Sequence, residues 1–343
     1  MEEQQKTEKK GARRWLGYAL KYGVPLVVSV LLCWMLFKDV DFDEMMVTIR
    51  NECDWRWIGL ALLLSIFSHI FRAMRWRIQL RALNVKAPLF PLVLSIFGTY
   101  AVNLVLPRLG ELWRTGYIAR REDAPFATVF GSMVADRLAD TVTVALLTLV
   151  TFLLAAGELG EYLGQNSAAY QSLLDLASSP WLWLGVVACI VAVVAFFRWR
   201  TDNAFVCKVQ GFAKGIWEGF AVIVHMPGKL RWLALTVCIW GCYFLQLYVA
   251  FFAFGFTADI VATYGTIAVL VTFVLSSLSM GVPSNGGIGP WQWAVIFGLG
   301  LYHLAQPQAT AFANLVMGMQ TLLLIVLGIF TFACIALRKQ KTK

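Results

Sequence analysis

Apolar runs long enough to cross a membrane recur along this chain from Gly23 to Leu337, separated by short polar segments. A helix needs about 20 apolar residues to cross the hydrocarbon core of a bilayer, where it satisfies its own backbone hydrogen bonds. The runs have a period of about 3.6 residues and exceed the length of a barrel strand, which excludes a membrane β-barrel. With 59% hydrophobic residues and a mean hydropathy of +0.68, the sequence predicts an all-α polytopic membrane protein.

The basic residues lie mainly in the segments between the apolar runs, where they contribute to a formal net charge of +9. This placement fits anionic lipid headgroups and membrane topology, so no nucleic-acid partner is predicted. The seven cysteines are scattered and the three histidines share no ligand spacing, so we predict no disulfide framework, metal site or cofactor. Nucleotide-binding and hydrolase motifs are absent from the sequence, and no catalytic residue is predicted.

The polar segments predict a single transmembrane domain over residues 1–343, built from two halves. A basic N-terminus covers 1–20, the first half 21–200, an amphipathic connector 203–229, the second half 230–337, and a basic tail 338–343. The connector alternates apolar and basic residues, as an interfacial helix does. About six full spans are expected, at 24–37, 57–71, 124–156, 181–197, 232–254 and 309–337.

Lysine and arginine are distributed asymmetrically between the two sides. The basic segments are the N-terminus, 72–86, 120–121, 198–231 and the C-terminus, whereas 38–56, 157–180 and a short turn around Asp259 are acidic or uncharged. Because cytoplasmic loops carry the excess of lysine and arginine, both termini are predicted to be cytoplasmic, in a bacterial inner membrane.

This orientation is consistent only if two segments enter the membrane and return to the side they came from. These are residues 87–121 and 260–303, and each is interrupted by proline and glycine. The breaks are at Pro107 and Gly110 in the first, and at Pro283, Gly286, Gly287, Gly289 and Pro290 in the second. We therefore predict two re-entrant helical hairpins in an inverted repeat, whose breaks approach each other near the middle of the protein. Two full crossings per hairpin remain the alternative.

Charged residues follow the first break at short intervals. Asn103 precedes Pro107, and Arg108, Glu111 and Arg114 come after it. An ionisable side chain at the centre of a membrane helix costs about 2.5–3.5 kcal/mol, so such residues usually mark a substrate path. A half-helix terminus with guanidinium groups suits a phosphate. The alternative is an Arg108–Glu111 or Glu111–Arg114 pair that only stabilises the fold.

Two further polar sites are expected near the breaks. Asp136, Arg137 and Asp140 lie in the apolar run 124–156, where Arg137 is spaced to pair with Asp140. The remaining acid would then need Arg108 or Arg114, unless the three residues neutralise one another locally. Gln292 is a polar residue in the first turn after Pro290. A packed helix kink is the structural alternative at this second break.

These motifs, in this order and spacing, resemble the membrane-embedded flippase domain of lysylphosphatidylglycerol synthases, the bacterial multiple-peptide-resistance proteins. The resemblance covers the chain from the first predicted span to the last. Two positions depart from the family pattern, because Asp136 and Gln292 stand where the family usually has glutamate. The chain ends at Lys343 without an aminoacyltransferase domain. The resemblance therefore implies a stand-alone member that translocates lipid without synthesising it.

The predicted function is translocation of an anionic or aminoacylated phospholipid between the two leaflets. The predicted substrate-binding residues are Asn103, Arg108, Glu111, Arg114, Asp136, Arg137, Asp140 and Gln292. Two alternatives stay open: translocation of a polyprenyl-phosphate-linked glycolipid, and a non-transporting membrane partner of a separate synthase or glycosyltransferase. Membrane phospholipids are the expected partners, and a separate lipid-modifying enzyme or a second copy of the chain is left open.

Overall fold

The computed structural model describes residues 42–155, 179–180, 184, 226–282 and 284–341, and within these ranges it contains helices and no β-strand. The prediction of an all-α polytopic membrane protein is confirmed. Some predicted segments lie outside the described residues: the N-terminal segment 1–20, the span 24–37, nearly all of 157–180, 181–197 and 203–229, and Pro283.

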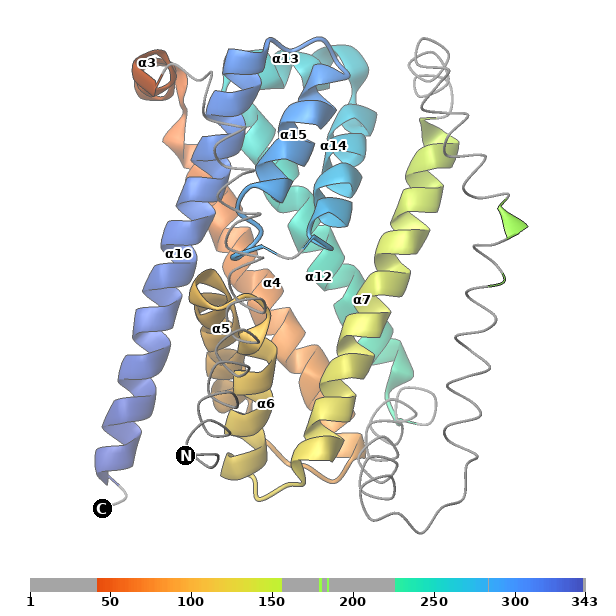
Figure 1. The fold of residues 1–343 in the computed structure, drawn as a ribbon, viewed down its shortest axis with the longest axis vertical. Helices are drawn as coiled ribbons and strands as arrows, with labels where there is room; N and C mark the ends of the chain where they lie inside the picture. The colour runs from red at the N-terminus through yellow and green to blue at the C-terminus, as the bar shows by residue number, and fades with distance from the viewer. Residues whose placement is uncertain (1–41, 156–178, 181–183, 185–225, 283, 342–343) are drawn as a thin grey trace, which may run out of the picture.

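Four of the described helices are long and apolar enough to cross a membrane. They are α4 (Trp55–Ala82), α7 (Phe126–Leu154), α12 (Lys229–Ala250) and α16 (Gln306–Lys341). At 1.5 Å per residue they extend about 42, 43, 33 and 54 Å, more than the roughly 30 Å of bilayer hydrocarbon. α4 packs along α12, with α7 and α16 on opposite sides in the view of Figure 1. These four helices correspond to four of the six predicted spans.

Two helical hairpins stand between the long helices. The first is α5 (Leu89–Val105) with α6 (Leu109–Arg121), and the second is α14 (Thr266–Ser279) with α15 (Pro290–Gly300). Each arm has between 11 and 17 residues, fewer than a full crossing requires. Figure 1 shows the hairpins entering from opposite ends of the bundle, with their breaks directed toward its middle. This is the arrangement expected for two re-entrant hairpins of an inverted repeat.

The tips of the two hairpins touch each other. The Arg108 guanidinium donates a hydrogen bond of 2.7 Å from Nη2 to the carbonyl oxygen of Gly281 in the other hairpin. Leu104 lies against Gly286, where a Cβ atom would come within 2.6 Å of Leu104 Cδ2 and where φ is +64°. The positive φ favours glycine at position 286, and the absence of a side chain lets Leu104 pack against it. The predicted approach of the two breaks is thus confirmed.

One expectation about the second hairpin is wrong. Asp259 was expected in a short turn, but it lies in a separate helix, α13 (Gly255–Tyr264), which follows the short 3-10 helix η2 (Phe251–Ala253). The chain bends by 112° between α13 and α14, at Gly265. The descending arm of the hairpin therefore begins at Thr266 rather than at residue 260.

The first described span is also longer than expected. The sequence suggested that the span ends at Phe71 and that Arg72 and Arg75 begin a basic loop, but α4 continues through Ala82. Arg72 is 4% exposed and Arg75 is fully buried. Both arginines therefore belong to the interior of the bundle, and of the predicted basic segment Arg81 and Lys86 remain exposed at its end.

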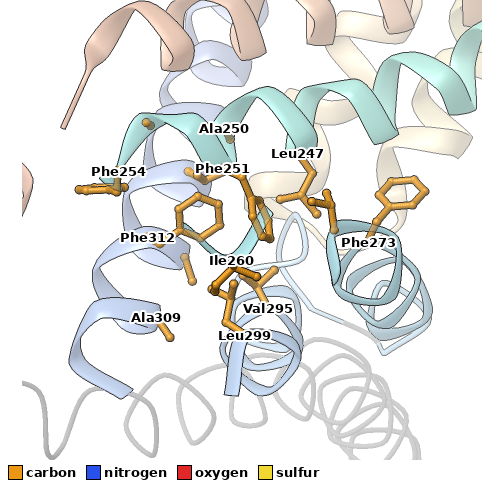
Figure 2. Packing of buried hydrophobic residues seen from close by; sticks show 14 of the residues in the cluster. Leu247, Ala250, Phe251, Phe254, Ile260, Phe273, Val295, Leu299, Ala309 and Phe312 are labelled. Atoms are coloured by element: carbon orange, nitrogen blue, oxygen red, sulfur yellow. The ribbon is translucent and has the colours of Figure 1, made fainter. Parts of the chain in front are cut away.

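Each hairpin has its own apolar core. α4, α5 and α6 enclose a cluster that includes Trp76, Leu92 and Ile118. A larger cluster joins α12 and α16 to the second hairpin, and Figure 2 shows Phe251 and Phe312 facing Val295 and Leu299 of α15 within it. The rings of Phe251 and Phe312 meet edge to face at 5.2 Å. These cores fix the hairpins against the long helices and so determine where the breaks lie.

Candidate functional site

The charged residues of the described bundle interior form two clusters that adjoin at α6 and α7. The buried arginine cluster consists of Arg72, Arg75, Arg114, Asp136 and Asp140. The tip cluster consists of Asn103, Arg108, Glu111 and Arg137, where the first hairpin meets α7 and the second hairpin.

Arg75 holds the buried arginine cluster together. Its Nη2 atom lies 2.7 Å from both Asp136 Oδ1 and Asp140 Oδ1, and its Nε donates to Asp136 Oδ1 at 2.9 Å. Its Nη1 donates to Thr236 of α12 at 3.3 Å. The guanidinium therefore connects α4 to α7 and α12. A buried charge is stable only when it is paired and hydrogen-bonded in this way.

Arg72 lies one turn earlier on α4 and bonds to the same two carboxylates. Its Nη1 is 2.7 Å from Asp140 Oδ2 and 3.4 Å from Asp136 Oδ2, while Nη2 donates to the Tyr243 hydroxyl at 3.3 Å. Both aspartates thus use both of their oxygens on arginines of α4. No carboxylate oxygen in this cluster is left without a cation.

Arg114 gives the buried arginine cluster a cation in excess. It is 1% exposed and its Nη2 lies 3.7 Å from Asp136 Oδ2, beyond hydrogen-bonding distance. Its guanidinium lies over the Trp76 ring at 4.6 Å from the centroid, an attractive cation–π geometry. Its Nε and Nη2 have no hydrogen-bond partner among the described residues. With three arginines against two aspartates, the cluster has a net charge of +1.

Asn103 shapes the break of the first hairpin. Its Oδ1 accepts the Gly110 backbone N–H at 2.8 Å, and its Nδ2 lies 3.4 Å from Glu111 Oε2. A Cβ atom at Gly110 would collide with the Thr99 carbonyl oxygen, so only glycine permits this approach of α6 to α5. Asn103 therefore caps the start of α6 and orients Glu111.

Glu111 and Arg137 form the ion pair of the tip cluster, between α6 and α7. The Arg137 side chain is 40% exposed and that of Glu111 is 14% exposed, in contrast to the buried arginine cluster. The expected pairing of Arg137 with Asp140 is wrong, as are the alternative pairs of Glu111 with Arg108 or Arg114. Asp140 is occupied by the arginines of α4, so Arg137 pairs with Glu111.

Arg108 is the exposed cation at the tip. Its backbone is left-handed, with φ of 61° and ψ of 1°, a conformation that costs a non-glycine residue about 1–3 kcal/mol. This turn directs the side chain across to the carbonyl oxygen of Gly281. Its near neighbours in sequence, Val105 and Leu106, and Leu138 beside Arg137 are exposed apolar residues. A cationic group thus lies among lipid-compatible side chains.

The break of the second hairpin has no charged side chain among its described residues. Gln292 is 5% exposed; its Oε1 accepts the Gly289 backbone N–H at 2.9 Å, and its Nε2 donates to Asn314 Oδ1 at 2.6 Å. The amide closes the first turn of α15 and attaches it to α16. In this position Gln292 orients the backbone of the break.

The eight predicted site residues are therefore divided by the fold. Glu111 contacts both Asn103 and Arg137 beside the first break, where Arg108 bonds to Gly281 of the second hairpin; Arg114, Asp136 and Asp140 lie in the buried arginine cluster; Gln292 lies in the second break. Arg72 and Arg75 were not expected in any site. A stripe of polar residues at helical spacing on α4 is the signal that would have indicated Arg72 and Arg75. The buried polar residues of this stripe are Ser65, Ser68, His69, Arg72, Arg75 and Gln79. Among the described residues no group of His, Cys, Asp and Glu could hold a metal ion.

The chain is similar in sequence to several known proteins. The UPF0104 membrane protein MJ1595 of Methanocaldococcus jannaschii is 21% identical over 288 residues, covering 78% of this chain and 81% of the relative. The UPF0104 membrane protein PH1989 of Pyrococcus horikoshii is 26% identical over 137 residues, 39% of each chain. The glycosyltransferase AglD of Haloferax volcanii is 26% identical over 121 residues, 35% of this chain and 19% of that protein.

A family model supplies the assignment. The model described as lysylphosphatidylglycerol synthase TM region matches residues 23–328, which include both hairpins and all the residues of the two charged clusters. Together with the all-helical fold and the paired hairpins, this match shows that the chain belongs to the lysylphosphatidylglycerol synthase TM region family.

Proposed function

We propose that this protein translocates a phosphate-bearing lipid between the leaflets of its membrane, with the tip cluster as the headgroup site. The observation that carries the proposal is the exposed Arg108 at the contact between the two hairpins, next to the partly exposed Arg137–Glu111 pair on α7 and α6. Arg137 lies about 16 Å along α7, a helix about 43 Å long, so this cluster is well inside the bundle. An ionisable side chain at membrane depth is by default a candidate for a functional site.

The chemistry of the tip cluster suits a lipid phosphate. The tip cluster contains two arginines and one glutamate, so it has a net charge of +1 before substrate binds. Arg108 donates to a neutral backbone carbonyl, and a phosphate oxygen is a stronger acceptor for a guanidinium. Arg137 shares the phosphate from α7, and Glu111 attracts the ammonium group of an aminoacylated headgroup. The acyl chains stay in the bilayer while the headgroup passes the hairpin tips.

The orientation of the protein is part of this proposal. With both termini in the cytoplasm of a bacterial inner membrane, the α5–α6 hairpin opens to the cytoplasm and the α14–α15 hairpin to the outside. A headgroup at the tips would then stand between two hairpins that open to opposite surfaces. This is the arrangement by which inverted repeats support alternating access.

A polyprenyl-phosphate-linked glycolipid is a second candidate substrate. The observation that favours it is the similarity to the glycosyltransferase AglD over 121 residues. Both lipid classes present a phosphate to the same arginines, so the tip cluster fits either. The same similarity supports the third candidate function. In this case the protein translocates no lipid and is the membrane partner of a separate glycosyltransferase.

A liposome assay separates these candidates. Purified protein is reconstituted with fluorescent phosphatidylglycerol, fluorescent lysylphosphatidylglycerol or a fluorescent polyprenyl phosphate, and the accessible leaflet is quenched with dithionite. We expect protein-dependent movement of at least one of the three lipids, reduced about tenfold or more by Arg108→Gln. The headgroup class that moves fastest identifies the substrate.

The matched control is Arg120→Gln, which removes the same charge from an exposed position on the last turn of α6. It should leave both lipid movement and folding unchanged. If no lipid moves faster than in empty liposomes, the translocation proposal is wrong and the partner hypothesis takes its place. Equal movement with Arg108→Gln and Arg120→Gln would exclude the tip cluster as the headgroup site.

A further inference from the structure

A groove runs along the outer side of the second hairpin, between its two arms. Its volume is about 550 Å³, and it is lined by Leu275, Leu278 and Ser279 of α14 and by Trp293, Ala294 and Phe297 of α15. Its sides are almost entirely apolar. Other residues of the same arms, among them Phe273, Val295 and Leu299, are buried in the larger apolar core.

The two sides of α15 explain the groove. Val295 and Leu299 point into the core, toward Phe251 and Phe312, as Figure 2 shows. Trp293 and Phe297 lie on the other side of the helix, stacked on each other at 5.4 Å with nearly parallel rings. Trp293 is 55% exposed. A stacked aromatic pair therefore forms one wall of the groove and faces away from the protein interior.

The groove begins where the tip cluster ends. Val282 lines its tip end, and the preceding residue, Gly281, accepts the hydrogen bond from Arg108. From Val282 the groove runs back along the last turn of α14, past Ser279 and Leu278 to Leu275. The exposed guanidinium of Arg108 thus lies near one end of the apolar groove. This combination is complementary to a molecule with an anionic head and a hydrocarbon tail.

We infer that this groove binds one hydrocarbon chain of the lipid whose phosphate is held by Arg108. The inference rests on the proposed function for the identity of the headgroup site, and it adds the site for the tail. One chain held along α14 and α15 would keep the phosphate at the hairpin tips while the second chain stays free in the bilayer. The groove thus acts as a positioning site that selects lipids over free phosphates.

The groove is of a size to hold a hydrocarbon chain, with a volume of about 550 Å³. That volume falls within the range of about 300–1,000 Å³ found for small-ligand sites. The apolar lining is as compatible with methylene groups as the surrounding lipid, so a hydrocarbon chain can lie in the groove without exposing polar groups.

Photo-crosslinking tests the groove directly. The full chain is placed in nanodiscs with phosphatidylglycerol carrying a diazirine in one acyl chain, irradiated, digested and mapped by mass spectrometry. We expect adducts on Trp293 or Phe297 that are lost, at least fivefold, when unlabelled phosphatidylglycerol is added in excess. Exposed residues of α16, such as Ile329 and Phe330, report ordinary boundary lipid, and their adducts should follow the mole fraction of probe without saturating.

Two variants strengthen the test. Ser279→Trp fills the groove and should reduce the Trp293 and Phe297 adducts about fivefold, whereas Ile329→Trp on α16 is the control and should not. Arg108→Gln should reduce the groove adducts of phosphatidylglycerol while leaving those of a diazirine-labelled diacylglycerol unchanged. Adducts in the groove that are no stronger or more saturable than those on α16 would overturn the inference, even if Ser279→Trp failed to fold.

The experiments distinguish a wrong tail site from a wrong proposed function. Saturable groove adducts in a protein that moves no lipid would support the tail site and contradict translocation. Lipid movement that depends on Arg108, without saturable groove adducts, would support translocation and contradict the tail site.

Discussion

The buried arginine cluster and the tip cluster contain the same kinds of residues, yet they are built for different tasks. Each has one more arginine than carboxylates, and each joins α6 to α7. In the first, both aspartates are saturated by Arg72 and Arg75 at distances down to 2.7 Å and are closed off from the surroundings. In the second, Arg108 and Arg137 remain exposed. The exposure of its arginines, rather than its net charge, distinguishes the candidate binding site from the structural cluster.

The difference arises between two neighbouring residues of one helix. Asp136 and Arg137 follow each other on α7, and successive residues of a helix point about 100° apart. Asp136 therefore points to α4, and Arg137 points to the hairpin tip. A substitution at either residue should reveal which cluster supports the fold and which supports lipid movement.

Removing Asp136 should have the largest effect. Asp136→Ala leaves Arg72 and Arg75 with Asp140 alone, and the loss of one partner of a buried ion network costs about 3–5 kcal/mol. Unfolding in detergent, followed by tryptophan fluorescence, should show a strongly lowered midpoint and a low folded yield. A midpoint equal to that of wild type would show that this cluster does not stabilise the fold.

Replacing the extra cation of the same cluster should cost much less. Arg114→Met removes a charge whose nearest carboxylate oxygen is 3.7 Å away, and it brings the cluster to net neutrality. The contact with Trp76 and the long ion pair with Asp136 are lost, and we expect this to cost about 1–2 kcal/mol. The matched variant Arg75→Met should instead cost about 3–5 kcal/mol, since Arg75 bonds both aspartates. Equal unfolding midpoints for the two variants would contradict this ranking.

In the tip cluster the effect on stability should be smaller still. Glu111→Gln removes a carboxylate from a partly exposed pair and should change the free energy of unfolding by about 1 kcal/mol or less. Its effect should appear in transport, where lysylphosphatidylglycerol slows about fivefold relative to phosphatidylglycerol because the ammonium group loses its partner. The liposome assay with both lipids measures this ratio. An unchanged ratio would remove Glu111 from headgroup recognition.

The last prediction concerns the sides to which the hairpins open, and it should not change stability. In a cysteine-free background, Lys86→Cys lies in the loop that precedes α5, and His303→Cys lies in the loop that follows α15; both positions are exposed. An impermeant thiol reagent applied to intact cells should label position 303 and spare position 86. Labelling of both positions from one side would contradict the opposed hairpins, and labelling of position 86 alone would reverse the orientation.

Much of the fold was predictable because its signals are local. Pro107 and Gly110 interrupt one apolar segment, Gly286 and Gly289 interrupt another, and each is flanked by loops of matching charge. These features alone predicted two hairpins whose breaks meet. The extra helix α13 was missed because Gly255 and Gly265 bound a segment of only ten residues, too short for a periodicity to stand out.

The site was predicted less completely, for a physical reason. Hydropathy treats Arg72 and Arg75 as loop residues, because the cost of their burial is offset by Asp136 and Asp140 on another helix. Likewise, the rules for helix spacing pair Arg137 with Asp140, and the fold pairs it with Glu111 of α6. The sequence alone does not show which carboxylates lie beside each arginine in the folded protein. It therefore does not show which arginines are neutralised.

The dependence of α4 on α7 has a consequence for how the protein is made. Asp136 is synthesised 64 residues after its partner Arg72. At about 5–20 residues per second, the ribosome needs roughly 3–13 s to add these residues. During that interval α4 has two unpaired arginines, which oppose insertion by about 5–7 kcal/mol. We therefore expect the part of α4 from Arg72 onward to stay at the membrane surface until α7 arrives. Insertion of this domain would then take two steps, in which a later helix completes the insertion of an earlier one.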